Sequence, residues 1–460
     1  MSHSPFDRQT AVHSIEVLRP EFERELKTLV DIPTVSAQVD HKPDIARGVE
    51  AAAALIRKAG GAAEVLRPRN PDGNPIVLGR LGTDPEAPTV TVYNHMDVQP
   101  ADREQDGWTS EPFEMTIDGD RYRGRGTTDD KGPALSALFG ARYARQHGVR
   151  TNVAFLWEFE EEIGSPSFEA ALEDHRDRLS TSSIVVSDTI WISRGRPAVP
   201  AGLRGLQGFL LRLRTGQRDE HSGVTGGAAR NPIAELMGVV CECFDPYTGQ
   251  VRIPGFYDEV IAPTDEEFAG FKASGFTVEQ FMKDHQFSSL RSTDPLEVMS
   301  RIWARPTFEV HGVVGGYSGA GLKTIVPPYA EVKVSCRLVP SMTGSRTAQR
   351  VREFIQARHP DIEVITDHTL EPYAGQTSGP LADAISSAIE FGFGARPVFV
   401  REGGSIGAVL SMQKILGKPI SFLGLSLPEH GYHAPNEFFD WGQAQGGILA
   451  FADYFRRLGG

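Results

Sequence analysis

Apolar residues recur along the chain with two different periods, which separate helices from strands. From Val17 to Val30, apolar residues stand at helical spacing, and a second helical stretch spans 46–58. Four other runs are β-branched or continuously apolar, as expected of parallel strands buried on both faces. These predicted strands lie at 88–93, 152–159, 183–188 and 420–425.

The pattern changes between Gly205 and about Gln376. Residues 209–214 and 329–338 alternate between apolar and polar side chains, which is typical of an antiparallel sheet with one open face. A helix is predicted at 345–359 and a strand at 362–366, while the charged and aromatic stretch 247–306 predicts irregular helices. This middle region therefore reads as a separate α+β insert.

The two patterns together predict an α/β chain with a discontinuous first domain and an inserted second domain. The first has a mostly parallel sheet flanked by helices and comprises 1–205 and 377–460. The insert, 206–376, has an antiparallel sheet. A chain of 460 residues, 40% of them hydrophobic, is long enough for two substantial cores.

Charge and composition exclude some classes of partner. The formal net charge is −13, which disfavours a nucleic-acid surface. The first 19 residues lack the apolar core of a signal peptide, and no window approaches a membrane-spanning length, so we expect a cytoplasmic protein without a membrane partner. Cys241, Cys243 and Cys336 form neither a disulfide framework nor a zinc-site spacing and are interpreted as packing residues.

Each of the four predicted strands runs into residues that can bind metal ions. In open α/β sheets, ligands bind outside the carboxyl ends of the strands, so the four strand ends predict one shared site. The residues that follow the strands are His95 with Asp97, Glu160 to Glu162, Asp188, and the stretch 429–437 that contains His433.

A fifth candidate is the Gly-rich stretch 124–132, in which Asp129 and Asp130 precede Pro133 and an apolar helix. Taken alone, this stretch could be a polar surface turn. The repeated ligand-type residues at the strand ends favour a cation site instead.

His, Asp and Glu without thiolates suit zinc, manganese or cobalt, and paired carboxylates favour two ions. Such a site still needs a base that removes and returns a proton. Glu161 is the natural candidate and Glu160 the competing one, because sequence alone does not fix the register of three consecutive glutamates. Asp97 is expected to orient the other ring nitrogen of His95 or a neighbouring group.

These residues resemble the M20 metallopeptidases, most closely their cytosolic nonspecific dipeptidase and carnosinase branch. The similarity spans nearly the whole chain in the order of the family. The matching segments are 93–100, 106–108, 124–133, 161–162 with 164–165, 187–188, 221–224, 319–327, 337–340, 401–406, 433 and 436–437.

The resemblance implies a dinuclear site in which Asp129 bridges two divalent ions and the peptide bond into Asp130 is cis. The other implied ligands are His95 and Asp188 for one ion, and Glu162 and His433 for the second. Zn²⁺ is the expected ion, and Mn²⁺ accepts the same ligands. The resemblance also implies that Glu161 is the general base and acid and that Asp97 orients the surroundings of His95.

The insert would then be a lid and dimerisation domain. The resemblance implies a homodimer in which His221 reaches the partner's active site and stabilises the oxyanion. It further implies that Arg337 binds the substrate's C-terminal carboxylate. Gly403, Gly404 and Ser405 are implied to contact the same end of the substrate, with Arg401 and Glu402 in support.

Two departures from the family pattern concern the metal site. Asn94 stands where the family usually has glycine before the histidine. The stretch before His433 also differs from the branch, so His430 remains a competing ligand and the substrate preference stays open.

The sequence therefore predicts a two-metal hydrolase for dipeptides or short peptides with a free C-terminal carboxylate. An N-acyl amino acid or carbamoyl amidohydrolase of the same superfamily is the alternative. A catalytically inactive, metal-binding dimeric scaffold is a third hypothesis. The presence of Glu161, His221 and all implied ligands argues against the scaffold, which has no need of a proton shuttle.

Overall fold

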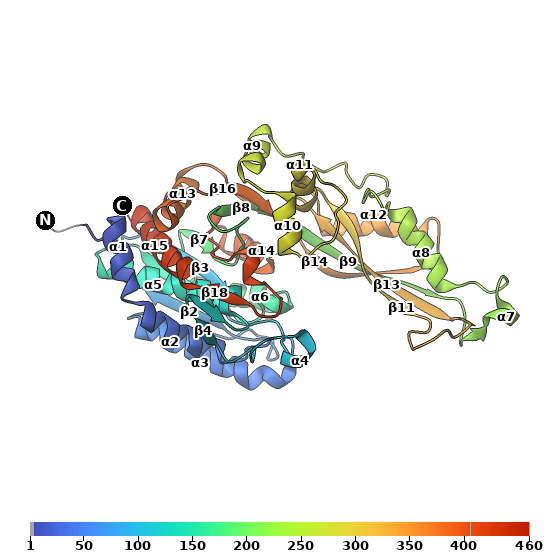
Figure 1. The fold of residues 1–460 in the computed structure, drawn as a ribbon, viewed down its shortest axis with the longest axis horizontal. Helices are drawn as coiled ribbons and strands as arrows, with labels where there is room; N and C mark the ends of the chain where they lie inside the picture. Colours follow the sequence, from blue (N-terminus) through green and yellow to red (C-terminus); the bar gives the residue numbers. More distant parts are fainter. Residues whose placement is uncertain (1–3, 405, 460) are drawn as a thin grey trace.

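The computed structural model describes residues 4–404 and 406–459. It is an elongated α/β structure with a helix-flanked sheet at one end and an arm built on an antiparallel sheet at the other (Figure 1). The prediction of a mostly parallel sheet together with a separate antiparallel sheet is confirmed. Among the described residues, no helix combines the length and apolar character needed to cross a lipid bilayer.

The larger sheet has six strands, of which β6, β3, β7 and β17 are mutually parallel. β1 and β2 complete one edge in antiparallel pairing. In sheet order the strands are β1 (Ala62–Leu66), β2 (Ile76–Leu81), β6 (Asn152–Glu158), β3 (Thr89–His95), β7 (Ser183–Val186) and β17 (Ile420–Phe422).

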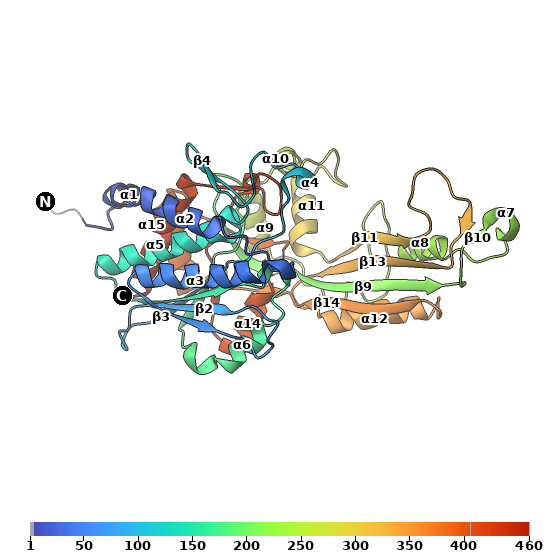
Figure 2. The ribbon, with the colours of Figure 1, turned by 90° about the horizontal axis from the view of Figure 1, so that it is seen from below.

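Helices cover both faces of this sheet. Figure 2 shows the sheet between α2, α3 and α5 on one side and α6 and α14 on the other. The longer helices α5 and α15 pack against each other, as do α13 and α15. The bounds are α1 (Arg8–Glu16), α2 (Arg19–Val30), α3 (Lys42–Lys58), α5 (Gly132–Gln146), α6 (Phe168–Asp174), α13 (Pro380–Phe393), α14 (Gly407–Leu416) and α15 (Trp441–Leu458).

Every residue of β6 is buried, as expected of a central strand covered on both faces. β3 continues two residues beyond the predicted run, so His95 is itself the last strand residue, paired with Glu158 at the end of β6. β17 is shorter than predicted and ends at Phe422, after which the Leu423 N–H still donates to the Val186 carbonyl at 2.9 Å.

The arm is a four-stranded antiparallel sheet with a hydrophobic cluster of its own. Its helices α8 and α12 contact both the sheet and each other, so they cover one face. Buried residues alternate with partly exposed ones along β9, which agrees with the period of two in the sequence. The elements are β11 (Thr307–Gly315), β13 (Tyr329–Leu338), β9 (Gly205–Arg214), β14 (Glu363–Leu370), α8 (Pro232–Cys243) and α12 (Gly344–Gln356).

The predicted irregular helices of 247–306 are short helices that lie where the arm meets the larger sheet (Figure 1). They are α9 (Asp265–Ala273), α10 (Val278–Asp284) and α11 (Pro295–Met299). Phe271 and Trp303 from this segment pack with Val400 in a third hydrophobic cluster.

The described residues also form three small sheets and two four-residue α-helices. The sheets are β15 (Tyr373–Ala374) with β8 (Ala198–Leu203) and β16 (Val398–Glu402); β18 (Phe438–Asp440) with β5 (Arg121–Arg123) and β4 (Thr116–Asp118); and β10 (Glu220–His221) with β12 (Ile325–Val326). The helices are α4 (Arg103–Asp106) and α7 (Ser222–Thr225).

Candidate active site

The five residues expected to bind metal come together at the carboxyl edge of the parallel strands. His95 ends β3, Glu162 follows β6, and Asp188 follows β7. Asp129 lies in the turn before α5, and His433 lies in the loop before β18. The backbone of consecutive parallel strands therefore gathers side chains that are far apart in sequence.

Asp129 lies at the centre of this cluster. Its Oδ1 is 2.9 Å from His95 Nε2, and its Oδ2 is 3.1 Å from His433 Nε2. Although burial opposes ionisation, the contacts with His433 and His95 hold the pKa of Asp129 well below its usual value. A carboxylate whose two oxygens face two imidazoles has the arrangement that a bridging ligand needs.

The remaining candidate ligands surround Asp129. His433 Nε2 is also 3.1 Å from Glu162 Oε2, and His95 Nε2 is 4.0 Å from Asp188 Oδ2. The His433 side chain is 56% exposed, whereas the side chains of Asp129 and Glu162 are each only 3% exposed, so the cluster is reached from solvent on the His433 side.

The donor atoms fit a cation site on distance as well as on chemistry. His95, Asp129 and Glu162 each offer a ligand atom within 4.8 Å of the others, and so do His95, Glu161 and Asp188. All the atoms are imidazole nitrogens or carboxylate oxygens, which suit zinc or manganese. Burial raises the pKa of Asp188 to about 6 and that of Glu161 well above its usual value. Ionisation of these acids together is therefore unfavourable unless cations neutralise their charge.

Asp97 holds the glutamates through their backbone. Its carboxylate oxygens accept the N–H groups of Glu161 at 3.2 Å and Glu162 at 3.1 Å. The His95 ring Nδ1 lies 3.0 Å from the Asp97 backbone carbonyl and 3.6 Å from the carboxylate. Asp97 therefore lies nearer the histidine with its backbone carbonyl than with its carboxylate, which is hydrogen-bonded to the two glutamate N–H groups.

The structure separates the roles of the three consecutive glutamates. Glu160 accepts the N–H of Asn74 at 2.5 Å and the N–H of Ser167 at 2.9 Å, so its carboxylate is occupied in holding neighbouring loops. The carboxylates of Glu161 and Glu162 both lie in the ligand cluster. This geometry favours Glu161 over Glu160 as the residue that exchanges a proton.

The turn that carries Asp129 contains a cis peptide bond between Asp129 and Asp130, as the resemblance implied. Glu437 stabilises this turn by accepting the N–H groups of Gly126 at 3.0 Å, Thr128 at 2.9 Å and Asp129 at 3.2 Å. Arg125 also donates to Glu437 at 2.8 Å. The sequence pattern contained Glu437 but gave no indication of this structural role.

His430, the competing ligand, is buried outside the cluster. Its Nδ1 is 2.9 Å from Thr128 Oγ1, and its Nε2 is 3.1 Å from Asp440 Oδ2. Both ring nitrogens are thus engaged in the support of neighbouring loops, which favours His433 as the ligand.

Asn94, which stands in place of glycine, donates from Nδ2 to Asp130 Oδ2 at 2.7 Å. The side chain therefore supports the residue next to Asp129. Two further neighbours of the cluster were not predicted. Gln99 Nε2 donates to Glu162 Oε2 at 2.7 Å, and Tyr432 Oη donates to Asp188 Oδ1 at 3.1 Å.

Arg337, the expected carboxylate ligand, lies on β13 of the arm and lines a cavity of about 960 Å³ together with Arg204. Burial lowers the pKa of Arg337, and burial together with the neighbouring Arg337 charge lowers the pKa of Arg204 to about 10. Two such guanidinium groups favour an anion between them. The sequence gave no reason to single out Arg204.

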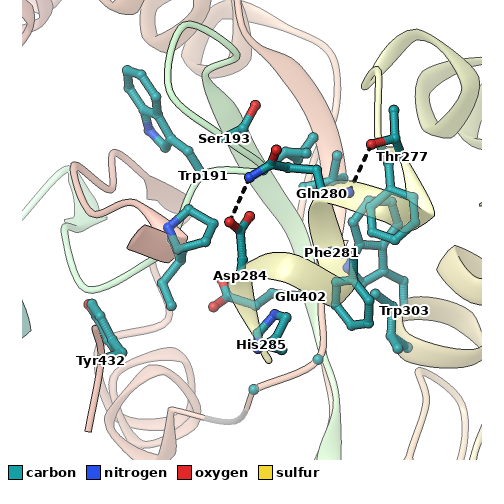
Figure 3. A pocket seen from close by; sticks show the side chains of 18 of the residues that line it. Trp191, Ser193, Thr277, Gln280, Phe281, Asp284, His285, Trp303, Glu402 and Tyr432 are labelled. Atoms are coloured by element: carbon teal, nitrogen blue, oxygen red, sulfur yellow. Dashed lines mark hydrogen bonds between the residues drawn. The ribbon is translucent and has the colours of Figure 1, made fainter. Parts of the chain in front are cut away.

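Gly403 and Gly404 line a second cavity, of about 540 Å³, together with Tyr432 (Figure 3). The Gly403 carbonyl accepts from Arg204 Nε at 3.3 Å, which connects this loop with the arginine pair. Ser405, the third residue expected here, lies outside the described residues.

His221 is not brought to the cluster within this chain. It ends β10, and both views place β10 or the adjacent α7 at the far end of the arm from β3 (Figures 1 and 2). The side chain is exposed, and its Nδ1 accepts the N–H of Gly223 at 2.9 Å.

Comparisons with known proteins identify the family of the chain. Residues 91–457 match the family described as Peptidase family M20/M25/M40. A human protein named Beta-Ala-His dipeptidase is 32% identical over 96% of this chain and 91% of its own length. A Schizosaccharomyces pombe protein named Cys-Gly metallodipeptidase dug1 is 31% identical over 96% of this chain and 97% of its own.

Two solved structures are also similar over nearly the whole chain. The crystal structure of human carnosine dipeptidase 1 has a TM-score of 0.85 and 29% identity, covering 98% of both chains. The Saccharomyces cerevisiae di-peptidase Dug1p has a TM-score of 0.86 and 27% identity, covering 99% of both chains.

Proposed function

The chain belongs to Peptidase family M20/M25/M40 and is a peptidase, and from this premise we propose that it is a two-metal dipeptidase. Its substrates are dipeptides or short peptides with a free C-terminal carboxylate. The observation that carries the proposal is the convergence of His95, Asp129, Glu162, Asp188 and His433 at one edge of the sheet.

Two divalent ions per subunit, Zn²⁺ or Mn²⁺, would polarise the scissile carbonyl and lower the pKa of the attacking water when bound. Asp129 would lie between the ions. The other ligands would be His95 and Asp188 for one ion, and Glu162 and His433 for the other. The short distances among these donors and their lack of thiolates support this assignment.

Glu161 takes the proton from the attacking water and returns it to the departing amine. Its position supports this role, because its carboxylate lies within 4.8 Å of donor atoms of His95 and Asp188. Asp97 holds the Glu161 backbone through a hydrogen bond of 3.2 Å and so acts as a positioning residue.

Arg337 binds the substrate's C-terminal carboxylate, and Gly403 and Gly404 contact the same end of the substrate, as is also expected of Ser405. The neighbouring guanidinium groups of Arg204 and Arg337 support an anion site here. The planar fork of arginine matches a carboxylate with two parallel hydrogen bonds.

The chain acts as a homodimer in which His221 completes the partner's active site and stabilises the oxyanion. The position of His221 at the end of the arm supports action on a second subunit. In this proposal 1–205 and 377–460 form the catalytic domain, and 206–376 form the lid and dimerisation domain. A cytoplasmic location remains a prediction of the sequence.

The test is a substrate panel measured on protein that has been stripped of metal and reloaded with Zn²⁺ or Mn²⁺. The panel contains Ala-Ala, β-Ala-His, Cys-Gly, Ala-Ala amide, N-acetyl-Ala and N-carbamoyl-Ala. We expect cleavage of free dipeptides and little cleavage of the amide. A preference for N-acetyl-Ala or N-carbamoyl-Ala would favour the amidohydrolase alternative, and no cleavage of any substrate by the loaded dimer would favour the inactive scaffold.

A further inference from the structure

The 540 Å³ cavity beside the metal cluster is lined by five separate stretches of the chain, two of which are 302–303 and 428–434. The other three are the segment after β7, the stretch 275–286 that contains α10, and residues 400–404 at the end of β16. Figure 3 shows aromatic side chains around much of this cavity, with Glu402 and Asp284 among its polar groups. The aromatic lining residues are Trp191, Phe276, Phe281, Trp303 and Tyr432.

The cavity opens next to the expected metal ligand Asp188. Tyr432 lines it and donates its hydroxyl to Asp188 at 3.1 Å. Glu402 also lines it, and burial together with the nearby Asp188 charge raises the pKa of Glu402 to about 8. A substrate group that enters this cavity is therefore adjacent to the reacting centre.

Glu402 lacks a cationic partner among the described residues. Its Oε2 atom is buried and has no hydrogen-bond partner there. The adjacent Arg401 is paired with Glu267 through contacts of 2.7 and 2.8 Å, so it leaves Glu402 unneutralised. A buried carboxylate of this kind is costly unless a cation compensates it.

The position of Glu402 is fixed by the sheet. It ends β16, which runs parallel to β8, and its carbonyl accepts the N–H of Arg204 at 3.2 Å. The next residue, Gly403, accepts from Arg204 Nε at 3.3 Å through its carbonyl, and Arg204 and Arg337 line the neighbouring cavity. A carboxylate in one cavity and two guanidinium groups in the next complement the two charged ends of a dipeptide.

We propose that Glu402 binds the protonated N-terminal amine of the substrate and thereby distinguishes a dipeptide from an N-acyl or N-carbamoyl amino acid. The proposal rests on the dipeptidase function proposed above. In an α-amino acid residue, the amine nitrogen lies about 2.5 Å from the carbonyl carbon. A carbonyl at the metal cluster therefore brings the amine close to Asp188 and Glu402.

The experiment compares L-Ala-L-Ala with propionyl-L-Ala, which lacks only the amine. kcat and KM are measured for the wild type, Glu402→Gln and Glu402→Asp, with metal content determined for each protein. Asp284→Asn is the matched control, because Asp284 lines the same cavity but accepts from Gln280 at 2.6 Å. If propionyl-L-Ala is cleaved too slowly, its inhibition constant against Ala-Ala replaces kcat/KM.

We expect Glu402→Gln to lower kcat/KM for Ala-Ala by about 10- to 100-fold, as for loss of a charged hydrogen bond. The kcat/KM for propionyl-L-Ala and the metal content should stay unchanged in Glu402→Gln. Glu402→Asp should recover part of the lost kcat/KM for Ala-Ala. An unchanged preference for Ala-Ala in Glu402→Gln overturns the inference but leaves the dipeptidase function intact. If Asp284→Asn loses the preference for Ala-Ala and Glu402→Gln keeps it, the inference is also overturned. A wild type that cleaves no dipeptide overturns both the inference and the proposed dipeptidase function.

Discussion

The carboxylate of Asp97 accepts the backbone N–H of Glu161 at 3.2 Å. Its second oxygen accepts the N–H of Glu162 at 3.1 Å, and its own carbonyl faces the ring of His95 at 3.0 Å. One buried residue therefore connects the end of β3 with the turn after β6. The distance between the proposed base and the proposed ligands depends on this connection.

Replacement of Asp97 by Asn should reduce turnover without unfolding the protein. An amide group has one oxygen, so one of the two backbone N–H groups would face an NH₂ group and lose its hydrogen bond. We expect kcat to fall about 10- to 100-fold because small displacements of a catalytic group are costly. Steady-state kinetics on a dipeptide would measure this, with Asp118→Asn on exposed β4 as the control. Equal losses in both variants would contradict the positioning role.

Replacement of Glu161 by Gln should separate proton transfer from metal binding. The amide cannot accept the proton of the attacking water, so we expect kcat to fall about 10²- to 10⁴-fold. Metal analysis should still find two equivalents bound. Glu162→Gln provides the comparison, since it should lower the metal content as well. Near-normal activity of Glu161→Gln would remove this residue from the role of base.

Removal of the metal ions should destabilise the fold as well as abolish activity. In the metal-free cluster, burial raises the pKa values of Glu162 and Asp188, with the neighbouring Asp129 charge adding to both shifts. Cations relieve this repulsion and bind the folded state, which stabilises it by about 2.7 kcal/mol at a 100-fold excess over Kd. Thermal unfolding with and without Zn²⁺ or Mn²⁺ would measure the shift. In Asp129→Asn, the metal ions should raise the unfolding temperature by less than in the wild type. An equal rise in the two proteins would place the ions elsewhere.

Mixed dimers should recover activity from two inactive variants. In the proposed homodimer, His221→Ala would lack the donor for the partner's site, and Glu161→Ala would lack the base of its own site. In a heterodimer, the site with intact Glu161 receives His221 from the other subunit. Random exchange makes half of the dimers heterodimers, each with one active site, so about one quarter of wild-type activity should return. Activity that stays at the level of the separate variants would show that His221 does not act across the interface.

The gathering of the candidate ligands was predictable because it follows from local patterns. Each parallel strand is recognisable as a buried run, and β3, β6 and β7 lead directly to His95, Glu162 and Asp188. The alternation in β13 predicted its bounds, Tyr329–Leu338, for the same reason. A period of two or a continuous apolar run is a property of neighbouring residues, so one sequence is enough to find it.

The supporting contacts could not be predicted because they join distant segments. Glu437 accepts from Gly126 some 311 positions away, and Gln99 donates to Glu162 some 63 positions away. The proximity of Arg204 to Arg337 likewise depends on how β8, β9 and β13 meet. Nothing in the local pattern indicates which partner a buried polar side chain will find.

The ion pair between Glu21 and Arg142 joins the first turn of α2 to the C-terminal part of α5. The two terminal guanidinium nitrogens, Nη1 and Nη2, each donate to one carboxylate oxygen at 2.8 Å, and this contact lowers the pKa of Glu21. Glu21→Gln should reduce the free energy of unfolding at pH 7 by about 1 kcal/mol, the range of a well-formed partly exposed pair. Glu50→Gln, at an exposed position on α3, is the matched control and should have little effect.

The direction of the Glu21 pKa shift determines how the stability loss in Glu21→Gln depends on pH. The pKa of Glu21 is lower in the folded than in the unfolded protein, so its stabilisation is present above the unfolded pKa of about 4.3. It is lost as the pH falls through the folded pKa, because both states then carry a proton. Urea unfolding should therefore find a constant gap between wild type and Glu21→Gln from pH 7 to about 5.5, and a smaller gap at pH 4 and below. A gap that widens on acidification would mean that the carboxylate destabilises the folded chain.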